Sequence, residues 1–289
     1  MIQRLCLIGV GLMGGSLALA LRRRGLVREI LGVDPDSGNL EAARQLRIVD
    51  AGYSDLRHGV NGADWVVIAA PVGAVPGILS DLQPVWREDA VYTDTGSTKA
   101  DVVVALERMF GRAPANFVPG HPITGAERSG AMAAEAGLFE NRRVILTPVA
   151  ATGPEPLERV SAMWRSVGAA VTCMDPGHHD QVLAATSHLP HVLAFVLTEM
   201  LGRKDEQQEI FQYAAGGFRD FTRIASSDPR MWRDICLANT REIVPLIEQY
   251  REALRMAARL MRQGDAEDLL QLFSAARSAR QRFLDQLEN

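Results

Sequence analysis

Lysine is almost absent from this sequence. Only Lys99 and Lys204 are lysines, and the other 29 basic residues are arginines. Codon usage in a GC-rich genome is the simplest origin of this bias. Whatever its origin, any mechanism that needs a lysine amine has only two candidates in the chain.

Cysteine, net charge and long apolar runs are also scarce. The three cysteines, Cys6, Cys173 and Cys236, are far apart and odd in number, which argues against a disulfide scaffold and predicts a reducing, cytoplasmic location. A net charge of −4 provides no basic field for a nucleic acid. The N-terminus has no signal-peptide order, and the longest apolar stretch, residues 189–201, contains a histidine and a glutamate, so no membrane contact is expected.

The 289 residues suggest two domains. In the first half, short apolar runs alternate with helical patterns, which predicts parallel βαβ units in a doubly wound α/β sheet of the Rossmann type. After about residue 174 the strand-like runs stop and helices follow. We therefore predict a dinucleotide-binding domain at 1–174 and an all-α domain at 175–289. The expected strands are 5–8, 30–33, 65–69, 90–93, 117–118, 144–146 and 170–173, and the expected later helices are 182–201, 206–213, 231–261 and 266–287.

A glycine-rich loop follows the first predicted strand. Gly9, Gly11 and Gly14 match G-x-G-x-x-G between a buried strand and a helix, which is typical of a dinucleotide site. Gly9 allows the tight turn, Gly11 lets the backbone approach a pyrophosphate, and Gly14 allows close helix packing. Leu12 and Met13 within the loop, and Pro71 after the third expected strand, complete the candidate contacts with the cofactor.

Asp34 lies twenty residues after Gly14, where the second predicted strand ends. A carboxylate in this position accepts hydrogen bonds from a ribose 2′-hydroxyl and repels a 2′-phosphate. We therefore expect the cofactor to be NAD rather than NADP, although an ordinary turn residue before a proline would look the same.

Five of the six histidines lie in motif-like settings. His121 follows a predicted strand in a glycine-flanked loop, where parallel sheets bind their ligands. His188 and His191 are three residues apart and share a helix face, but packed core histidines would show the same spacing. His178 and His179 precede an aspartate after a turn, which a helix cap explains. No cysteine lies nearby and H-E-x-x-H is absent, so no metal site is predicted.

Arginines are concentrated between residues 216 and 233. Arg219, Arg223, Arg230 and Arg233 outnumber the two aspartates in this segment. A guanidinium group can bind a carboxylate through two parallel hydrogen bonds. This pattern favours a small carboxylate substrate, although a solvated helix face is the alternative.

Together these segments resemble the prephenate dehydrogenase family, which includes arogenate and cyclohexadienyl dehydrogenases. The similarity runs from residue 9 to about residue 239. It is carried by the motifs at 9–16 (GVGLMGGS), 94–99 (DTGSTK), 120–130 (GHPITGAERSG), 187–191 (SHLPH) and 217–225 (GFRDFTRIA). Residues 98–101 also fit a helix capping box.

The resemblance implies NAD-dependent oxidative decarboxylation of prephenate to 4-hydroxyphenylpyruvate, a step of tyrosine biosynthesis. By similarity, His121 binds the ring hydroxyl and accepts its proton, and Ser97 lies beside that hydroxyl and the nicotinamide. Arg223 holds a substrate carboxylate, and Ser187, His191 and Gly216 line the substrate pocket. Glu127 gates that pocket. The family also implies that the helical domain forms a homodimer.

There are three alternatives to this prediction. Arogenate, alone or together with prephenate, is an alternative substrate, because one or two pocket residues decide between a keto and an amino group. A non-catalytic NAD-binding regulator would keep the fold and leave His121 idle. The β-hydroxyacid dehydrogenases share the layout but need a lysine early in their helical part, and no lysine occurs from residue 100 to 203.

Overall fold

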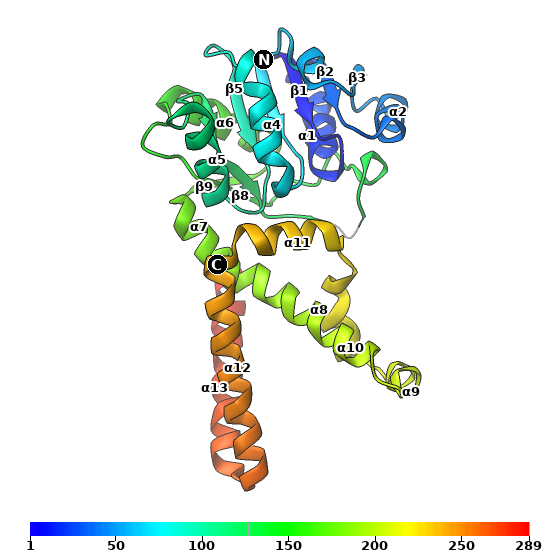
Figure 1. Ribbon diagram of the computed structural model, residues 1–289, viewed down its shortest axis with the longest axis vertical. Helices are drawn as coiled ribbons and strands as arrows, with labels where there is room; N and C mark the ends of the chain where they lie inside the picture. The colour runs from blue at the N-terminus through cyan, green and yellow to red at the C-terminus, as the bar shows by residue number, and fades with distance from the viewer. Residues whose placement is uncertain (126–127, 289) are drawn as a thin grey trace. The chain divides into compact units, whose positions relative to one another are not determined.

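The computed structural model describes residues 1–125 and 128–288 (Figure 1). The chain forms two compact units, Met1–Thr240 and Arg241–Asn289. The division predicted at residue 174 was placed by the change from strands to helices, and it stays a prediction.

The first unit begins with a six-stranded parallel sheet in the order β3-β2-β1-β4-β5-β6. This order reverses direction between β1 and β4, and ligands of open α/β sheets bind outside the carboxyl ends of strands at such a point. The α/β fold class predicted from the sequence is confirmed. The strands are β1 (Ile2–Ile8), β2 (Val27–Val33), β3 (Ala51–Tyr53), β4 (Trp65–Ile68), β5 (Val91–Asp94) and β6 (Phe117–Val118).

Both faces of this sheet are buried, which explains the nearly continuous apolar runs of its strands. In β1, Leu5 and Leu7 point into one core with helices α1 and α6, whereas Cys6 and Ile8 point into a second core with α4 and α5. The helices between the strands are α1 (Leu12–Arg23), α2 (Ser37–Gln45), α3 (Leu56–Val60), α4 (Val75–Leu82), α5 (Ala100–Phe110) and α6 (Pro154–Ser166). Short 3-10 turns are η1 (Val72–Ala74), η2 (Gln83–Val85) and η3 (Ala131–Ala133).

The later strands form a separate sheet rather than continuing the first one. Its order is β7-β8-β9, with β7 (Gly120–Pro122) antiparallel to β8 (Arg143–Leu146), and β8 parallel to β9 (Ala170–Cys173). The sequence predicted the strands at 144–146 and 170–173 as members of the parallel series, which is wrong. Apolar periodicity identifies a strand but not its neighbour, and a proline at the end of β7 gave no strand signal.

Helices α7–α11 complete the first unit (Figure 1). A π-helical turn, η4 (Ala184–His188), joins α7 (Pro176–Leu183) to α8 (Leu189–Gly202). The single helix predicted at 231–261 is wrong, because the chain leaves the helix at Asn239. The other elements are α9 (Gln207–Gln212), α10 (Gly216–Thr222), η5 (Arg223–Ser226) and α11 (Pro229–Ala238).

One helical stretch in the described part of the chain, Pro176–Gly202, is long and apolar enough to cross a membrane. That criterion uses length and composition alone. The stretch includes His179 and Asp180, which are buried and hydrogen-bonded to the sheet domain. The absence of membrane contact stays a prediction.

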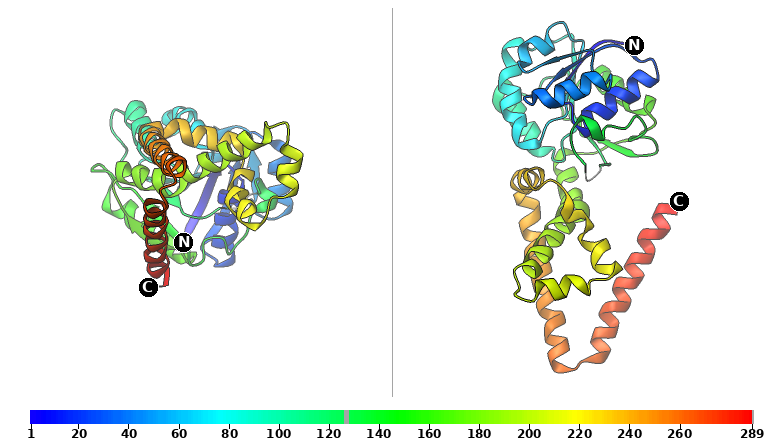
Figure 2. Two further views of the ribbon diagram at one scale, coloured as in Figure 1. Left: turned by 90° about the horizontal axis from the view of Figure 1, so that it is seen from below. Right: turned by 90° about the vertical axis from the view of Figure 1, so that its right-hand side faces the viewer.

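The second unit contains α12 (Thr240–Gln263) and α13 (Ala266–Glu288), which diverge from a turn at Gly264 (Figure 2). Gly264 has a φ of +67°, which a side chain would disfavour. Both helices expose large apolar side chains to solvent: Val244, Tyr250, Leu254, Met256, Met261, Leu270, Leu272, Phe273 and Phe283.

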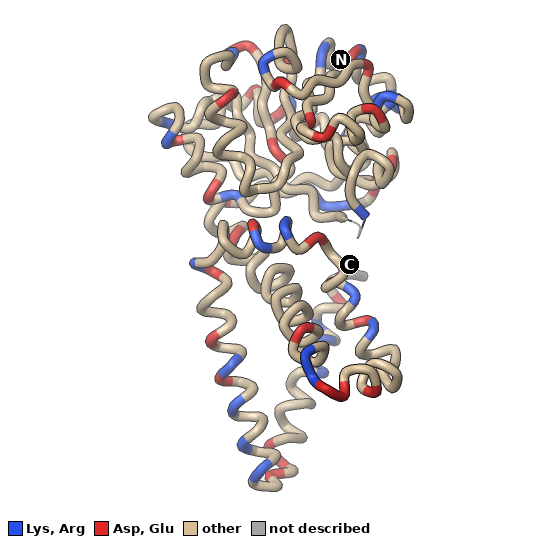
Figure 3. The backbone as a smooth tube through the Cα atoms, turned by 45° about the vertical axis from the view of Figure 1, so that its right-hand side comes forward, with Lys and Arg blue, Asp and Glu red and all other residues tan. Residues whose placement is uncertain are grey.

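Acidic and basic residues alternate along both units, and no long segment carries one sign of charge (Figure 3). The absence of a nucleic-acid partner stays a prediction from the net charge of −4.

Candidate active site

The loop from Gly9 to Gly14 connects β1 to α1 at the carboxyl edge of the sheet. Gly9 has a φ of +96°, and a Cβ there would collide with the carbonyl oxygen of Ala69. A Cβ on Gly14 would collide with the carbonyl oxygen of Gly9, whereas a Cβ on Gly11 would meet nothing within 4 Å. Gly9 and Gly14 therefore allow the loop to pack closely against itself and against the end of β4, whereas Gly11 leaves open space at the start of α1. Free backbone N–H groups at a helix start bind phosphate.

Asp34 stands at the end of β2, directly beside this loop. Its carboxylate accepts hydrogen bonds from the Val10 backbone N–H at 3.2 Å and from the Asn39 side-chain amide at 2.9 Å. Asn39 in turn accepts a hydrogen bond from the backbone N–H of Ala131 at 2.8 Å. These contacts fix a half-buried carboxylate next to the glycine loop, which is where a ribose hydroxyl lies in dinucleotide sites.

A buried ion pair ties the end of β5 to the start of β7. Lys99 is fully buried, and its ammonium group pairs with Asp94 and donates to the carbonyl oxygen of Gly120 at 2.9 Å. Asp94 also accepts hydrogen bonds from the backbone N–H groups of Gly96 and Gly120, at 2.8 and 3.0 Å. The pair therefore fixes the loop that carries Ser97 and the strand that carries His121.

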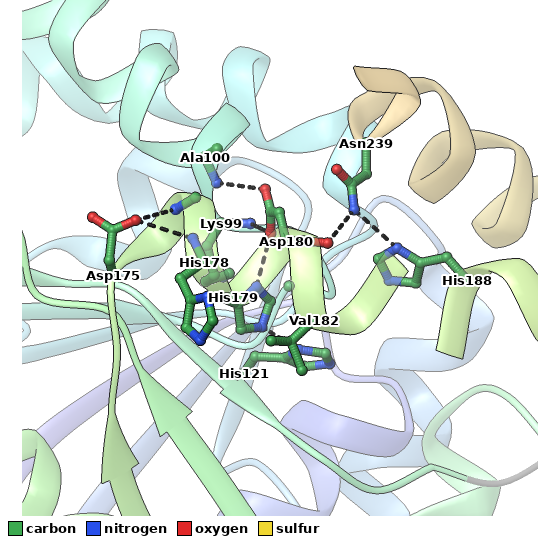
Figure 4. Close-up of polar contacts among 12 residues, drawn as sticks. Lys99, Ala100, His121, Asp175, His178, His179, Asp180, Val182, His188 and Asn239 are labelled. Atoms are coloured by element: carbon green, nitrogen blue, oxygen red, sulfur yellow. Dashed lines mark hydrogen bonds and ion pairs between the residues drawn. The ribbon is translucent and has the colours of Figure 1, made fainter. Parts of the chain in front are cut away.

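His121 projects from β7 toward α7 (Figure 4). Its Nδ1 lies 2.9 Å from Nε2 of His179, and Nδ1 of His179 lies 2.8 Å from a carboxylate oxygen of Asp180. His121 is partly exposed, whereas His179 and Asp180 are buried. Burial lowers the pKa of His121 well below its usual range, and the positive charge of Lys99 acts in the same direction. The imidazole is therefore neutral near pH 7.

The first turn of α7 determines which of its histidines faces the sheet. The Asp175 side chain caps the helix by accepting from the backbone N–H groups of Gly177 and His178 at 2.8 and 3.0 Å. Asp180 accepts from the backbone N–H groups of Lys99 and Ala100 at 2.8 and 2.9 Å, and so caps α5. The capping box predicted at 98–101 is wrong, because the cap comes from a residue 80 positions away. His178 points to solvent.

The π-helical turn η4 widens the helix where Ser187 and His188 occur. His188 is buried, and its Nδ1 lies 3.1 Å from the side-chain nitrogen of Asn239, which also donates to the carbonyl oxygen of Asp180 at 2.8 Å. Burial lowers the pKa of His188 to about 4. Asn239 is the residue at which α11 ends. The bond with Asn239 and the lowered pKa show His188 as a neutral, satisfied core residue.

His191 lies one turn further along, in α8. Its Nδ1 bonds the carbonyl oxygen of Ser187 at 2.8 Å, and its ring stacks on Trp232 of α11 with centroids 3.6 Å apart. Burial lowers the pKa of His191, the Ser187 carbonyl acts in the opposite direction, and the nearby charge of Arg223 lowers it further. The structure thus brings Ser187, His191 and Arg223 together from three elements.

The remaining predicted residues are placed as follows. Ser97 is partly exposed in the loop after β5, and Pro71 is exposed at the start of η1 after β4. Leu12 and Met13 form the first turn of α1, and Gly216 begins α10. Glu127 lies outside the described residues. Across 1–125 and 128–288, no group of three or more histidine, cysteine or acidic side chains could hold a metal ion.

Sequence reasoning missed three residues that shape the site: His179, Asp180 and Lys99. The sequence favours a helix cap for His179, and it shows Lys99 only as one of two lysines in the chain. His179 contacts His121, which is 58 residues away, and Asp180 bonds Lys99, which is 81 residues away. No local sequence pattern indicates contacts over such separations. The one available signal was that a histidine followed by an aspartate lies at the start of the first helix after the sheets.

Two family models match the chain. Residues 17–173 match "Prephenate dehydrogenase, nucleotide-binding domain", and residues 175–275 match "Prephenate dehydrogenase, dimerization domain". The chain belongs to the prephenate dehydrogenase family. It is therefore an oxidoreductase, and the match to the family's nucleotide-binding domain covers most of the Rossmann-type sheet, from residue 17 onward.

Curated relatives in the family align over nearly the whole chain. The cyclohexadienyl dehydrogenase of Zymomonas mobilis is 34% identical over 281 residues, covering 96% of this chain and 95% of that protein. The prephenate dehydrogenase of Bacillus subtilis is 36% identical over 276 residues, covering 95% of this chain and 74% of that protein.

Solved structures in the family share the fold. Prephenate dehydrogenase from A. aeolicus, in complex with hydroxyphenyl propionate and NAD+, superposes with a TM-score of 0.91 at 36% identity and covers 98% of this chain and 99% of that one. Arogenate dehydrogenase from Synechocystis gives a TM-score of 0.79 at 26% identity, with 97% and 99% coverage.

Proposed function

We propose that this family member catalyses the NAD-dependent oxidative decarboxylation of prephenate to 4-hydroxyphenylpyruvate, the dehydrogenase step of tyrosine biosynthesis. The observation that carries the proposal is the partly exposed, neutral His121 on β7, a strand that Asp94 bonds to the end of β5 in the nucleotide-binding sheet. Relatives named prephenate dehydrogenase, and a structure that binds NAD+, support this assignment.

The residues at the sheet edge fit NAD. The open space at Gly11 admits a pyrophosphate, the start of α1 faces it, and Asp34 supplies a carboxylate for a ribose hydroxyl. Leu12, Met13 and Pro71 border the same loop. When bound, the cofactor accepts the hydride that leaves the carbinol carbon of the substrate.

The chain's own residues handle the proton and the carboxylates. His121 accepts the proton of the substrate's ring hydroxyl, with Ser97 beside that hydroxyl, and it can do so because it is neutral. Arg223 binds a carboxylate as a charge-assisted hydrogen-bond donor, and Ser187, His191 and Gly216 complete the substrate pocket. The dienone that results loses CO2 because its ring becomes aromatic. The protein therefore orients the reactants and holds one proton.

Arogenate is a second candidate substrate. The 34%-identical relative from Z. mobilis is named cyclohexadienyl dehydrogenase, and the Synechocystis structure is that of an arogenate dehydrogenase. Arogenate carries an ammonium group where prephenate has a keto group, so it needs an acidic or carbonyl partner there. Two relatives that are 36% identical to the chain are named prephenate dehydrogenases, which supports prephenate as the preferred substrate.

The proposal includes a homodimer built by the residues 175–289. The dimerization-domain match over 175–275 supports it, and so do the exposed apolar side chains of α12 and α13, because faces of this kind are usually covered by a partner. We also propose a cytoplasmic location, since all three cysteines are unpaired. A protein that sediments only as a monomer at micromolar concentration would contradict the dimer.

Substitution of His121 tests the catalytic assignment. His121→Asn removes the base and is expected to lower kcat by about 10²- to 10⁴-fold, with the dissociation constant for NAD unchanged. His178→Asn is the matched control, because that histidine faces solvent. NADH formation at 340 nm measures kcat, and an unchanged kcat in His121→Asn would contradict the role.

A further inference from the structure

Three side chains, those of His121, His179 and Asp180, contact one another in that order (Figure 4). His179 stands between His121 and Asp180, with contacts of 2.9 and 2.8 Å, and both His179 and Asp180 are buried. We propose that His179 and Asp180 are positioning residues that fix the tautomer of His121, so that its Nε2 is the bare nitrogen offered to the substrate. This inference rests on the proposed role of His121 as the base.

The direction of the row follows from its buried end. Asp180 accepts hydrogen bonds from the backbone N–H groups of Lys99 and Ala100 and lies at the N-terminus of α5. Three donors, including His179, converge on its two oxygens, and a helix N-terminus favours negative charge. Both features favour the carboxylate, which can only accept hydrogen bonds.

Each later assignment follows from the previous one. Because Asp180 only accepts, Nδ1 of His179 must carry the proton. A neutral imidazole has one protonated nitrogen, so Nε2 of His179 is an acceptor. Nδ1 of His121, at 2.9 Å, must then be the donor. Its Nε2, the ring nitrogen that does not contact His179, is left without a proton.

This arrangement does two things for the reaction. It aims the basic lone pair of His121 at the substrate hydroxyl before the substrate arrives. When the hydroxyl O–H bond breaks and an Nε2–H bond forms, the positive charge on His121 lies at one end of a hydrogen-bonded row whose other end is a carboxylate. A buried carboxylate that orients a histidine base in this way is a known device of hydrolases.

The opposite arrangement makes a distinct prediction. If His179 carried protons on both nitrogens, its Nε2 would donate to Nδ1 of His121, and Nε2 of His121 would hold the proton instead. His121 could not then accept a proton at Nε2. The protonated nitrogen of His121 in the resting protein therefore decides between the two.

Nuclear magnetic resonance of the full-length, ¹⁵N-histidine-labelled protein reads that nitrogen directly. We expect proton attachment at Nδ1 in both His121 and His179 at pH 7.5, with signals assigned by single substitutions. A proton on Nε2 of neutral His121 would overturn the proposal. This test needs no substrate, so it stands even where the enzymatic assignment fails.

Kinetics of three variants provide the second test. His179→Leu keeps the size of the side chain but cannot accept a hydrogen bond, and we expect kcat to fall about 10- to 100-fold, a part of what removal of the base costs. His179→Gln can accept from His121 with Oε1 and donate to Asp180 with its amide, so we expect kcat within about threefold of the wild type. His178→Leu, one position away and exposed, is the matched control.

The results separate a positioning role from a structural one. The KM for NAD should stay within twofold in all three variants, because the glycine loop is untouched. Equal kcat losses in the Leu and Gln variants, or no loss in the Leu variant while His121→Asn is inactive, would overturn the relay alone. A wild-type protein without turnover would instead refute the proposed function.

Discussion

His121 can act as a base only while its imidazole is neutral, and its surroundings keep it so. Burial and the charge of Lys99 both disfavour the protonated ring, while the contact with His179 holds its orientation. The same burial makes His188 a neutral hydrogen-bond partner of Asn239 rather than a second base. At the scale of single residues, the surroundings therefore distinguish the proposed base, His121, from the structural histidine His188.

The dependence of kcat/KM on pH should reflect the lowered pKa of His121. A base is lost when the pH falls through its pKa, and the pKa of His121 lies well below the usual value of 6.5. We therefore expect kcat/KM to stay constant from pH 7.5 to below pH 6.5 and to decline only at lower pH. Initial rates of NADH formation across this range measure it. An acid limb centred at or above pH 6.5 would contradict the prediction.

The sequence predicted His121 as a candidate base but did not predict the residues that contact it. His121 was found because it follows a strand within a glycine-flanked motif. His179 and Asp180 were not, since their function depends on packing between α7 and β7, and such contacts leave no local pattern. Lys99 looked like a loop residue near the cofactor, yet it is fully buried in a pair with Asp94.

At the scale of elements, the β1–α1 turn is the best-determined part of the candidate site. Its three glycines are required for different reasons: Gly9 by its positive φ, Gly14 by contact with the loop, and Gly11 by the space it leaves. Only the open space at Gly11 concerns the binding of the cofactor. Substitutions can therefore separate folding from cofactor binding within one turn.

Gly11→Ala and Gly14→Ala form the informative pair. At Gly11 the added methyl meets no protein atom within 4 Å, so the melting temperature should stay the same while the dissociation constant for NAD rises about tenfold, or 1.4 kcal/mol. At Gly14 the methyl collides with the Gly9 carbonyl, so both stability and binding should fall. Calorimetry measures the two quantities. Unchanged NAD affinity in Gly11→Ala would show that the cofactor does not approach this turn.

Strand and helix types were largely predictable, whereas their pairing was not. The strands at 65–68 and 91–94 were predictable because their sequences contain nearly continuous apolar runs. The three-residue strand β3 has the sequence Ala-Gly-Tyr, which carries little strand signal, and it was missed. The strands β8 and β9 were found but assigned to the wrong sheet. The helix at 231–261 was predicted too long, since α11 ends at Asn239.

At the scale of the whole molecule, the two family domains divide the work. The six-stranded sheet carries the glycine loop, Asp34 and Ser97 after its strands, and the second sheet carries His121 on β7. The helices that follow bring His179, His191 and Arg223. The scarcity of lysine is part of this account. Lys99 is buried in an ion pair with Asp94, so its amine is not available as the base in the proposed reaction.

The most direct measurement mixes the purified full-length protein with NAD+ and prephenate and follows absorbance at 340 nm together with CO2 release. The account predicts one NADH and one CO2 for each 4-hydroxyphenylpyruvate formed, a lower kcat/KM with arogenate, and a lower kcat/KM with NADP because Asp34 repels the 2′-phosphate. Binding of NAD without NADH formation from either substrate would contradict it and would identify the protein as a non-catalytic member of its family.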